Sequence, residues 1–253
     1  MPKIILSGCC GHMGRAVADI CANDPDVEIA AGIDLLAQPM EGFPVFPSPS
    51  ACNLEGDVLI DFSHPAALEG LLEFCAARRL PAVLATTGYS EEQLARIEAA
   101  SREIPLFRSA NMSIGVNVLV DLVRRAAALL GEDFDVEIEE RHHRRKLDAP
   151  SGTALALGES IKEALGGEYE NVYDRSARRQ QRPEKEIGFS AVRGGTIVGE
   201  HDVIFAGEDE VITFSHSAYS KAVFAKGAVQ AGKFLAGKPA GLYDMSHVID
   251  GQI

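Results

Sequence analysis

Lys3-Ile4-Ile5-Leu6-Ser7-Gly8-Cys9-Cys10-Gly11-His12-Met13-Gly14 is the stretch that decides the fold of this 253-residue chain. A short, mainly apolar strand pattern runs into a turn with glycine at every third position, and a helical pattern follows through Val17, Ile20 and Cys21. Small residues at such a turn let the backbone approach a pyrophosphate at the helix N-terminus. The spacing is a variant of the dinucleotide-binding fingerprint. Taken alone, these glycines also fit an ordinary tight turn of an α/β fold.

A carboxylate stands where a dinucleotide site needs one. The second strand pattern, residues 27–33, ends in Asp34, twenty residues beyond Gly14. An acidic side chain at this distance accepts hydrogen bonds from the adenosine ribose. Leu35 follows in place of an arginine, so a 2′-phosphate would meet the carboxylate without a local cation to offset it. We therefore predict NADH as the preferred cofactor and NADPH as the less favoured one; a strand-end cap is the structural alternative for Asp34.

Strand and helix patterns continue to alternate up to residue 108. Strands are predicted at 58–62, 82–86 and 105–108, with helices at 65–79 and 91–103 between them. This alternation predicts a parallel sheet wound on both faces, whose ligands bind beyond the carboxyl ends of the strands. The predicted cofactor residues are Gly8, Cys9, Cys10, Gly11, His12, Met13, Gly14, Asp34, Phe62, His64, Ala85, Thr86, Thr87, Ser109, Ala110, Asn111 and Met112. For His64, which precedes Pro65, a place at a helix start is an equal alternative.

A basic segment marks the second half of an acidic chain. Residues 139–153 read Glu-Glu-Arg-His-His-Arg-Arg-Lys-Leu-Asp-Ala-Pro-Ser-Gly-Thr, while the whole chain has a formal charge of −13. Four fixed cations and two histidines precede a helix-start signal, where the backbone N–H groups of Gly152 and Thr153 face whatever the cations hold. The segment predicts a carboxylate or phosphate site with a proton donor. A solvated charged surface is the alternative.

Composition narrows the classes of function. The hydrophobic fraction of 46% is ample for a packed core, and the negative charge argues against nucleic-acid and anionic-membrane partners. No apolar run is long enough to span a bilayer, and the chain starts directly in a strand pattern, so we expect a cytoplasmic protein. The five cysteines are odd in number and show neither a disulfide framework nor zinc spacing. They predict reduced thiols and no metal site.

Further patterns describe the second half. A helix is predicted over 113–130 and a strand over 135–140, and a new domain begins near residue 115. Strands at 187–192, 199–205 and 210–216 are predicted to be antiparallel and joined by short turns. The segment 174–182 carries four arginines, and we expect a mobile, solvated loop there.

One segment identifies a family. His142-His143-Arg144-Arg145-Lys146-Leu147-Asp148-Ala149-Pro150-Ser151-Gly152-Thr153-Ala154 closely resembles the signature of the 4-hydroxy-tetrahydrodipicolinate reductases, also called dihydrodipicolinate reductases. The resemblance extends over essentially the full length. Further matching segments occur in the family's order at 8–14, 61–63, 85–88, 111–117, 193–195, 198–201 and 224–228.

The resemblance implies an architecture. The expected fold class is α/β, with an N-terminal Rossmann-like, doubly wound parallel sheet and an α+β C-terminal domain whose open, mainly antiparallel sheet is used in oligomerisation. The dinucleotide-binding domain would comprise 1–114 and 222–253. The substrate-binding and tetramerisation domain would comprise 115–221, and the protein would be a homotetramer.

The resemblance also implies a reaction. A hydride passes from the nicotinamide to C4 of (2S,4S)-4-hydroxy-2,3,4,5-tetrahydrodipicolinate with loss of water, which gives tetrahydrodipicolinate in lysine and diaminopimelate biosynthesis. By match to the family motif, His142 would be the main acid/base and Lys146 would be the second proton donor. His143, Lys146, Gly152 and Thr153 would bind the carboxylates of this small dicarboxylate substrate.

Two other functions remain open at this stage. An NADH-binding redox sensor would use Cys9-Cys10 as its switch, and another small-dicarboxylate dehydrogenase would keep the fold with a different substrate. Retention of both His142 and Lys146 argues against a sensor, which needs no proton donors. The complete segment from His142 to Thr153 argues against a different substrate.

Overall fold

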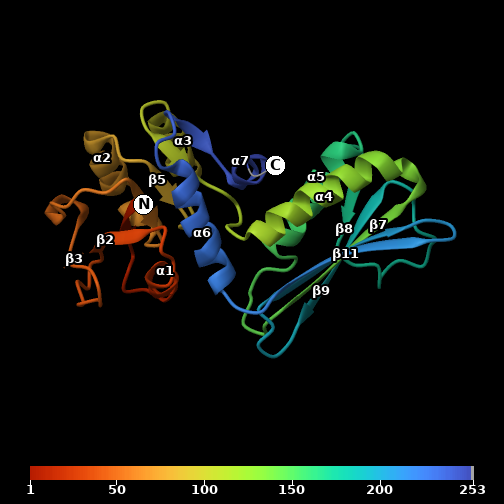
Figure 1. The fold of residues 1–253 in the computed structure, drawn as a ribbon. Helices are drawn as coiled ribbons and strands as arrows, with labels where there is room; N and C mark the ends of the chain where they lie inside the picture. Colours follow the sequence, from red (N-terminus) through yellow and green to blue (C-terminus); the bar gives the residue numbers. More distant parts are fainter. Residues whose placement is uncertain (252–253) are drawn as a thin grey trace. The chain divides into compact units, whose positions relative to one another are not determined.

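The computed structural model describes residues 1–251, which divide into two compact units. The first unit comprises Met1–Ile114 together with the segment that begins at Ala222, and the second unit comprises Gly115–Lys221 (Figure 1). No helix within residues 1–251 has the length and apolarity needed to cross a bilayer.

A seven-stranded sheet forms the centre of the first unit, and its pairings within the described residues are all parallel. The strand order is β12-β6-β5-β4-β1-β2-β3. The strands are β1 (Lys3–Ser7), β2 (Glu28–Ile33), β3 (Val45–Phe46), β4 (Val58–Asp61), β5 (Ala82–Leu84), β6 (Pro105–Phe107) and β12 (Gly241–Tyr243). The chain leaves β1 toward one edge through β2 and later returns to β4 on its other side, so the switch point of the topology lies beside β1, where doubly wound sheets bind ligands.

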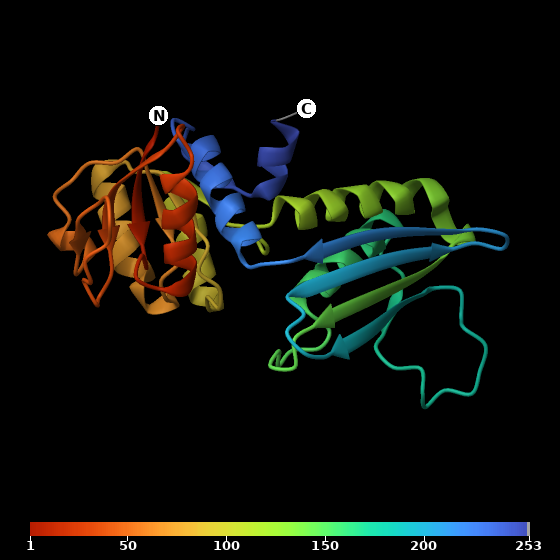
Figure 2. The same cartoon turned by 60° about the horizontal axis from the view of Figure 1, so that its bottom comes forward.

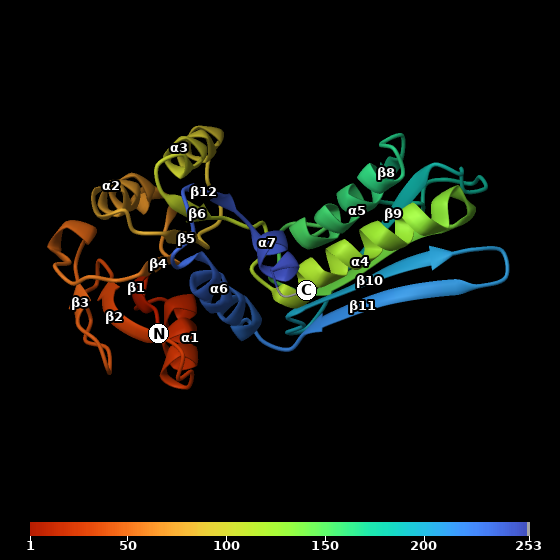
Figure 3. The ribbon, with the colours of Figure 1, turned by 45° about the horizontal axis from the view of Figure 1, so that its top comes forward.

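Helices cover both faces of this sheet (Figure 3). One face carries α1 (His12–Ala22), α6 (Ala222–Leu235) and α7 (Met245–Asp250), and the other carries α2 (Leu68–Arg78) and α3 (Glu91–Ser101). Successive strand residues alternate between the two faces, so Ile4 packs into the core with Val17, whereas Ile5 packs into the core with Leu71. Short 3₁₀ helices occur at Pro49–Ala51, Pro65–Ala67 and Gly131–Asp133.

The second unit is built on a five-stranded sheet in the order β11-β10-β7-β9-β8. The strands are β7 (Asp135–His142), β8 (Glu170–Val172), β9 (Glu186–Arg193), β10 (Gly199–Ala206) and β11 (Val211–Ala218). The sheet is mixed, because β10 pairs antiparallel with β7 and β11, whereas β9 pairs parallel with β7 and β8. The predicted antiparallel directions of β9, β10 and β11 are confirmed, but β9 and β10 are not paired with each other, because β7 lies between them. The connection from β7 to β9 contains a helix, which is long enough to return the chain in parallel.

Helices α4 (Ile114–Leu130) and α5 (Gly152–Ala164) cover one face of the second sheet (Figure 2). The core on this face contains Val123, Ile138, Leu157 and Val203. Within residues 115–221, no helix covers the opposite face. Because side chains alternate along a strand, the buried residues Glu140 and His142 lie on the helix-covered side of β7.

The fold class expected from the sequence is confirmed: a Rossmann-like, doubly wound parallel sheet is joined to a second domain of helices and a sheet. The loop at 174–182 is solvated as predicted, since seven of its nine residues are exposed, but three of its four arginines also form ion pairs with the sheet. Arg175 and Arg178 form ion pairs with the buried Glu186, and Arg182 pairs with carboxylates of β7. Acidic side chains along β7 and β9 hold the loop to the sheet.

Candidate active site

The glycine turn between β1 and α1 admits no side chain at two of its positions. Gly8 has a φ of +75°, and a Cβ there would lie 2.6 Å from the carbonyl oxygen of Phe62. A Cβ on Gly14 would lie 2.2 Å from the carbonyl oxygen of Gly8. Gly11, the N-cap of α1, offers no side-chain hydrogen bond to the first turn of the helix. The turn is thus tight, and the N-terminus of α1 is suited to an anionic group.

A cavity of about 590 Å³ opens beside this turn at the carboxyl ends of β1, β2 and β4. It lies at the switch point of the sheet, where a dinucleotide is expected. Five of the predicted cofactor residues line it: Gly8, Gly11, Asp34, Phe62 and His64. Ser48 and Ala67 add further parts of the wall. The cavity, the tight turn and the helix start together fit the adenosine and pyrophosphate part of a pyridine dinucleotide.

Asp34 connects the end of β2 to the glycine turn. Its Oδ2 accepts the backbone N–H of Cys10 and its Oδ1 accepts the N–H of Leu36, each at 3.0 Å. A carboxylate oxygen accepts two hydrogen bonds, so each retains capacity for a ribose hydroxyl in the cavity. The neighbouring Leu35 is 92% exposed, so position 35 can carry a larger polar side chain.

Several predicted cofactor residues use their side chains for contacts within the protein. Cys9 and Met112 are buried in the hydrophobic core, so only their main chains can contact a dinucleotide. Thr86 donates its hydroxyl hydrogen to Asp61 at 2.7 Å, which ties the end of β5 to the end of β4. His64 lines the cavity and also caps the Pro65–Ala67 helix, because its Nδ1 accepts the N–H of Ala66.

The remaining predicted cofactor residues do not line this cavity. They belong to the glycine turn and the first turn of α1, or to the segments that follow β5 and β6. These residues are Cys10, His12, Met13, Gly14, Ala85, Thr87, Ser109, Ala110 and Asn111.

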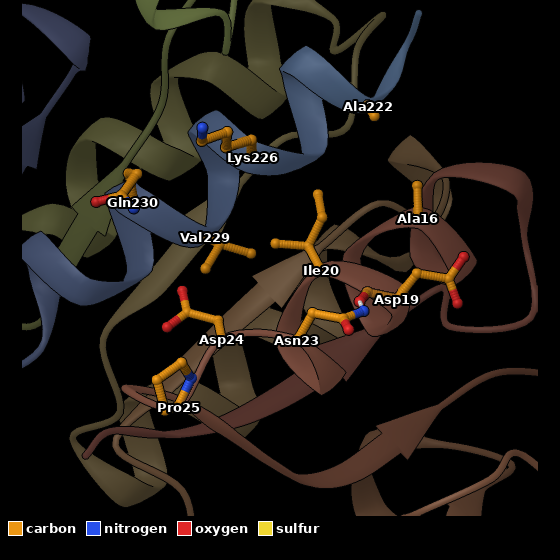
Figure 4. Close-up of a pocket in the computed structure, with 10 residues that line it drawn as sticks. All are labelled: Ala16, Asp19, Ile20, Asn23, Asp24, Pro25, Ala222, Lys226, Val229 and Gln230. Atoms are coloured by element: carbon orange, nitrogen blue, oxygen red, sulfur yellow. Dashed lines mark hydrogen bonds between the residues drawn. The ribbon is translucent and has the colours of Figure 1, made fainter.

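A second cavity, of about 540 Å³, lies between α1 and α6 in the same unit (Figure 4). Asp19, Asp24, Lys226 and Gln230 contribute its polar lining. Helix α1 begins at the carboxyl ends of the strands and runs back along the sheet, so its last turns lie near the amino ends of the strands. This cavity is therefore separate from the dinucleotide site.

A buried carboxylate organises the candidate active site of the second unit. Glu140, at 1% exposure, accepts two hydrogen bonds from the guanidinium of Arg193, each 2.7 Å long. It also accepts the Nδ1–H of His142 at 2.6 Å and the backbone N–H of Ser151 at 3.1 Å. Four donors thus satisfy one carboxylate that water hardly reaches.

Ser151 is the N-cap of α5, at the helix start that the sequence predicts near Gly152. Its Oγ accepts the N–H of Ala154 at 3.2 Å and lies 3.0 Å from Nε2 of His201. The rings of His201 and His142 meet edge to face, with centroids 5.2 Å apart. Gly152 and Thr153 form the first turn of the helix immediately after this cap. The N-terminus of α5 is therefore fixed beside His142.

Lys146 lies in the turn that follows β7. Its backbone N–H donates to the carbonyl of His143 at 3.0 Å, and its Nζ pairs with Asp148 at 2.9 Å. The ammonium is near enough to His142 to lower the pKa of that imidazole. The structure thus brings together His142, Lys146 and the start of α5.

Not all cations of the basic segment 139–153 belong to the site around His142. Arg141 lies on the other face of β7, where it pairs with Glu139, Glu200 and Asp202 at 2.8, 3.2 and 2.9 Å. Arg144 and Arg145 are exposed. The interpretation of four clustered cations holding one anion is therefore wrong for Arg141, because strand alternation sends it away from His142.

Burial controls protonation in this cluster. Burial lowers the pKa of His142, the hydrogen bond and charge of Glu140 oppose this, and Lys146 and Arg193 lower the pKa further; the net shift is downward. Burial, with His142 nearby, lowers the pKa of His201 to about 4. Burial tends to raise the pKa of Glu140, but hydrogen bonds from Arg193 and His142 outweigh it and the net shift is downward. At neutral pH the site thus holds an ionised Glu140 and two neutral imidazoles.

Sequence reasoning missed three residues of this site as functional candidates: Glu140, Arg193 and His201. Arg193 lies beside His142 because β9 pairs in parallel with β7 in a register that places these two residues opposite each other. No local pattern reveals that pairing. The period-two alternation of β7, which puts Glu140 and His142 on one face, was the available signal for Glu140.

The arrangement can bind an anionic group and move a proton. With Nδ1–H donated to Glu140, neutral His142 keeps the lone pair on Nε2 as a proton acceptor. Lys146 provides an ammonium donor, and the α5 N-terminus provides backbone N–H groups suited to a carboxylate.

Comparisons with known proteins agree over nearly the whole chain. Residues 2–112 match the family model "Dihydrodipicolinate reductase, N-terminus", and residues 115–249 match "Dihydrodipicolinate reductase, C-terminus". A 4-hydroxy-tetrahydrodipicolinate reductase of Caldanaerobacter subterraneus is 51% identical over 98% of both chains, and one of Clostridium tetani is 46% identical over 99% of this chain and 98% of its own. A solved structure, dipicolinate-bound dihydrodipicolinate reductase from Paenisporosarcina sp. TG-14, has the same fold, with a TM-score of 0.78 at 24% identity over 96% of this chain and 97% of its own. The chain therefore belongs to the dihydrodipicolinate reductase family.

Proposed function

We propose that this protein is an oxidoreductase that reduces (2S,4S)-4-hydroxy-2,3,4,5-tetrahydrodipicolinate to tetrahydrodipicolinate, with loss of water, in lysine and diaminopimelate biosynthesis. Family membership and the names of relatives at 46–51% identity support the reaction. The observation that carries the proposal is the fixed pairing of His142 with the start of α5 through Glu140. This pairing supports the proposal that His142 is a proton acceptor and that the neighbouring N-terminus of α5 binds a substrate carboxylate.

The side chains of the second unit fit the proton transfers that this reaction needs. Loss of water would remove a proton from the ring carbon next to C4 and supply one to the departing hydroxide, and a bound nicotinamide would supply the hydride to C4. The neighbouring carbon then regains a proton. Nε2 of His142 would accept and return the ring proton, and the ammonium of Lys146 would protonate the leaving hydroxide.

Substrate binding follows from the same groups. The N–H groups of Gly152 and Thr153 at the start of α5 would bind one carboxylate, with help from the helix dipole. Lys146 and His143, on the turn after β7, would bind and orient the dicarboxylate. The first unit would hold the dinucleotide along the glycine turn and Asp34.

The proposal includes a homotetrameric assembly of this protein and a cytoplasmic location. The sheet face that carries Glu139 and Arg141 is uncovered in the second unit, and it would pack against other copies in a homotetramer (Figure 2). A cytoplasmic location fits a reductase that uses NADH and carries five free thiols.

The preference for NADH is tested by an exchange at the end of β2. Replacing Asp34 with Ser and Leu35 with Arg removes the carboxylate that meets a 2′-phosphate and adds a cation at an exposed position. We expect the ratio of kcat/KM for NADH to that for NADPH to fall by roughly 10²-fold or more, because the exchange adds a charge-assisted hydrogen bond to the 2′-phosphate and removes a repulsion. An unchanged ratio would show that Asp34 does not read the ribose.

A redox-sensor function is less well supported by the structure. Cys9 and Cys10 have Sγ atoms 4.0 Å apart, and with Asp34 they form a group of metal-type ligand atoms within the turn. Burial, reinforced by Cys10 and Asp34, raises the pKa of the Cys9 thiol to about 12. A thiol with that pKa stays protonated at neutral pH and reacts slowly with oxidants and metals.

The substrate class is tested with pyridine-2,6-dicarboxylate, a planar mimic of the ring. We expect it to compete with substrate, because both carboxylates match the α5 start and Lys146. Calorimetry of the enzyme with its dinucleotide measures the affinity, and steady-state inhibition measures the competition. Binding of a different small dicarboxylate without any binding of this mimic would support another dehydrogenase instead.

A further inference from the structure

We propose that Glu140, held by Arg193, is a positioning residue that fixes one tautomer of His142 and ties this ring to both substrate-binding segments. The proposal rests on the proposed function insofar as His142 is the acid/base of the reaction. Glu140 itself is 1% exposed and contacts the imidazole of His142 at Nδ1, so it acts through other residues.

Tautomer control follows from the hydrogen bond between Glu140 and His142. An ionised carboxylate only accepts hydrogen bonds, so at 2.6 Å it requires a hydrogen on Nδ1. The neutral ring then carries its lone pair on Nε2, the atom available for substrate chemistry. Without this acceptor, nothing at Nδ1 selects the tautomer that accepts a proton at Nε2.

The same carboxylate fixes the start of α5. Its Oε1 accepts the backbone N–H of Ser151 at 3.1 Å, eleven residues along the chain from Glu140. Ser151 in turn caps α5, whose first residues are Gly152 and Thr153. One side chain therefore sets the acid/base and the carboxylate-binding N–H groups at a constant separation, which transition-state stabilisation requires.

Arg193 neutralises the charge of Glu140 and also connects this carboxylate to the segment that carries Asp148. Its two Nη atoms form a bidentate pair with Glu140, and Nη2 also donates to the carbonyl of Asp148 at 2.6 Å. Asp148 pairs through its side chain with Lys146. The Glu140–Arg193 pair thus links β7, β9, the turn that carries Lys146 and the first turn of α5.

The charges around His142 show why this carboxylate matters for proton transfer. Arg193 from β9, Lys146 from the following turn and the neutral His201 from β10 face the ring, and Glu140 from β7 faces its Nδ1. Both cations oppose protonation of His142, and Glu140 favours it. Glu140 therefore offsets the cations when Nε2 takes up a proton during the reaction.

The experiment compares Glu140→Gln with Glu139→Gln in the full-length enzyme. Glu139 is the preceding residue of β7, faces the opposite side and pairs with Arg141, so it controls for the loss of a strand carboxylate. In Glu140→Gln the amide NH₂ can donate to Nδ1, which favours the wrong tautomer of His142. We expect kcat to fall about 10²- to 10⁴-fold, the range of a general acid/base contribution, with NADH affinity unchanged.

Two readouts separate positioning from a merely structural role. The pKa of His142 should fall further in Glu140→Gln, because the group that raises it is gone, so the limb of the kcat/KM profile that reports this imidazole should move to lower pH. NMR of nitrogen-labelled histidine should show Nδ1–H for His142 in the parent and in Glu139→Gln, and loss of that tautomer in Glu140→Gln.

A second variant covers the case in which Glu140→Gln does not fold because Arg193 is left buried without a counter-charge. Glu140→Gln combined with Arg193→Gln removes both charges and should still lose the Nδ1–H tautomer and the turnover. If the variant that folds keeps the tautomer, turnover and pH profile of Glu139→Gln, the proposal is wrong. The NMR measurement needs no substrate, so failure of the proposed reaction would be seen separately as an inactive parent enzyme with an intact His142 tautomer.

Discussion

We expect turnover to fall about 10²- to 10⁴-fold when His142 is replaced by Gln, with an unchanged affinity for NADH. Gln fills similar space and can still donate to Glu140, so the buried cluster is preserved. It cannot accept and return a proton at the position of Nε2. The loss therefore appears in kcat, because the removed interaction belongs to the transition state.

The control for this variant is His247→Gln, a substitution of an exposed histidine of the first unit that lies in α7. It should leave both kcat and KM unchanged. NADH affinity is followed by quenching or enhancement of nicotinamide fluorescence. A His142→Gln enzyme with the turnover of the parent would remove His142 from the mechanism.

We expect the second large effect from replacing Lys146 with Met, a loss of about 10²- to 10⁴-fold in kcat/KM that is divided between kcat and KM. The ammonium is proposed both to bind a substrate carboxylate and to protonate the leaving hydroxide, so both parameters respond. Its side chain is 21% exposed, whereas its partner Asp148 is 58% exposed. An ion pair to so exposed a carboxylate is weak, so the substrate can replace Asp148 at little cost.

Arg145→Met is the matched control for Lys146→Met, since Arg145 precedes Lys146 and is exposed. We expect less than a two- to threefold effect from it, as is usual for an exposed charge at the rim of a site. Steady-state kinetics over a range of substrate concentrations separates kcat from KM. Equal losses of kcat/KM in the two variants would mean that the reaction depends on the total positive charge of this segment and not on Lys146 itself.

Local patterns predicted the glycine turn and the parallel sheet of the first unit. The turn at Gly8–Gly14 and the strand that ends at Asp34 are encoded within a few residues, and the parallel sheet follows from regular alternation. The start of α5 was likewise predictable, because Ser151 is a capping residue immediately before the helix. These features depend on residues that are close to one another in the sequence, so the sequence alone predicts them.

The features that were missed depend on contacts between distant segments. Arg193 reaches Glu140 only because β9 returns beside β7 in parallel, and the arginines of 174–182 find carboxylates on other strands. The error at Arg141 was avoidable in principle. The strand was predicted to end at Glu140, whereas it continues to His142, and two more residues of alternation place Arg141 on the opposite face.

The most direct test of the central claim is oxidation of NADH, and separately of NADPH, with substrate generated in situ from pyruvate and aspartate semialdehyde by the preceding synthase. The account predicts rapid consumption of NADH that requires the synthase product, slower consumption of NADPH, and loss of the signal with His142→Gln. No consumption of either cofactor, despite demonstrated dinucleotide binding, would contradict it.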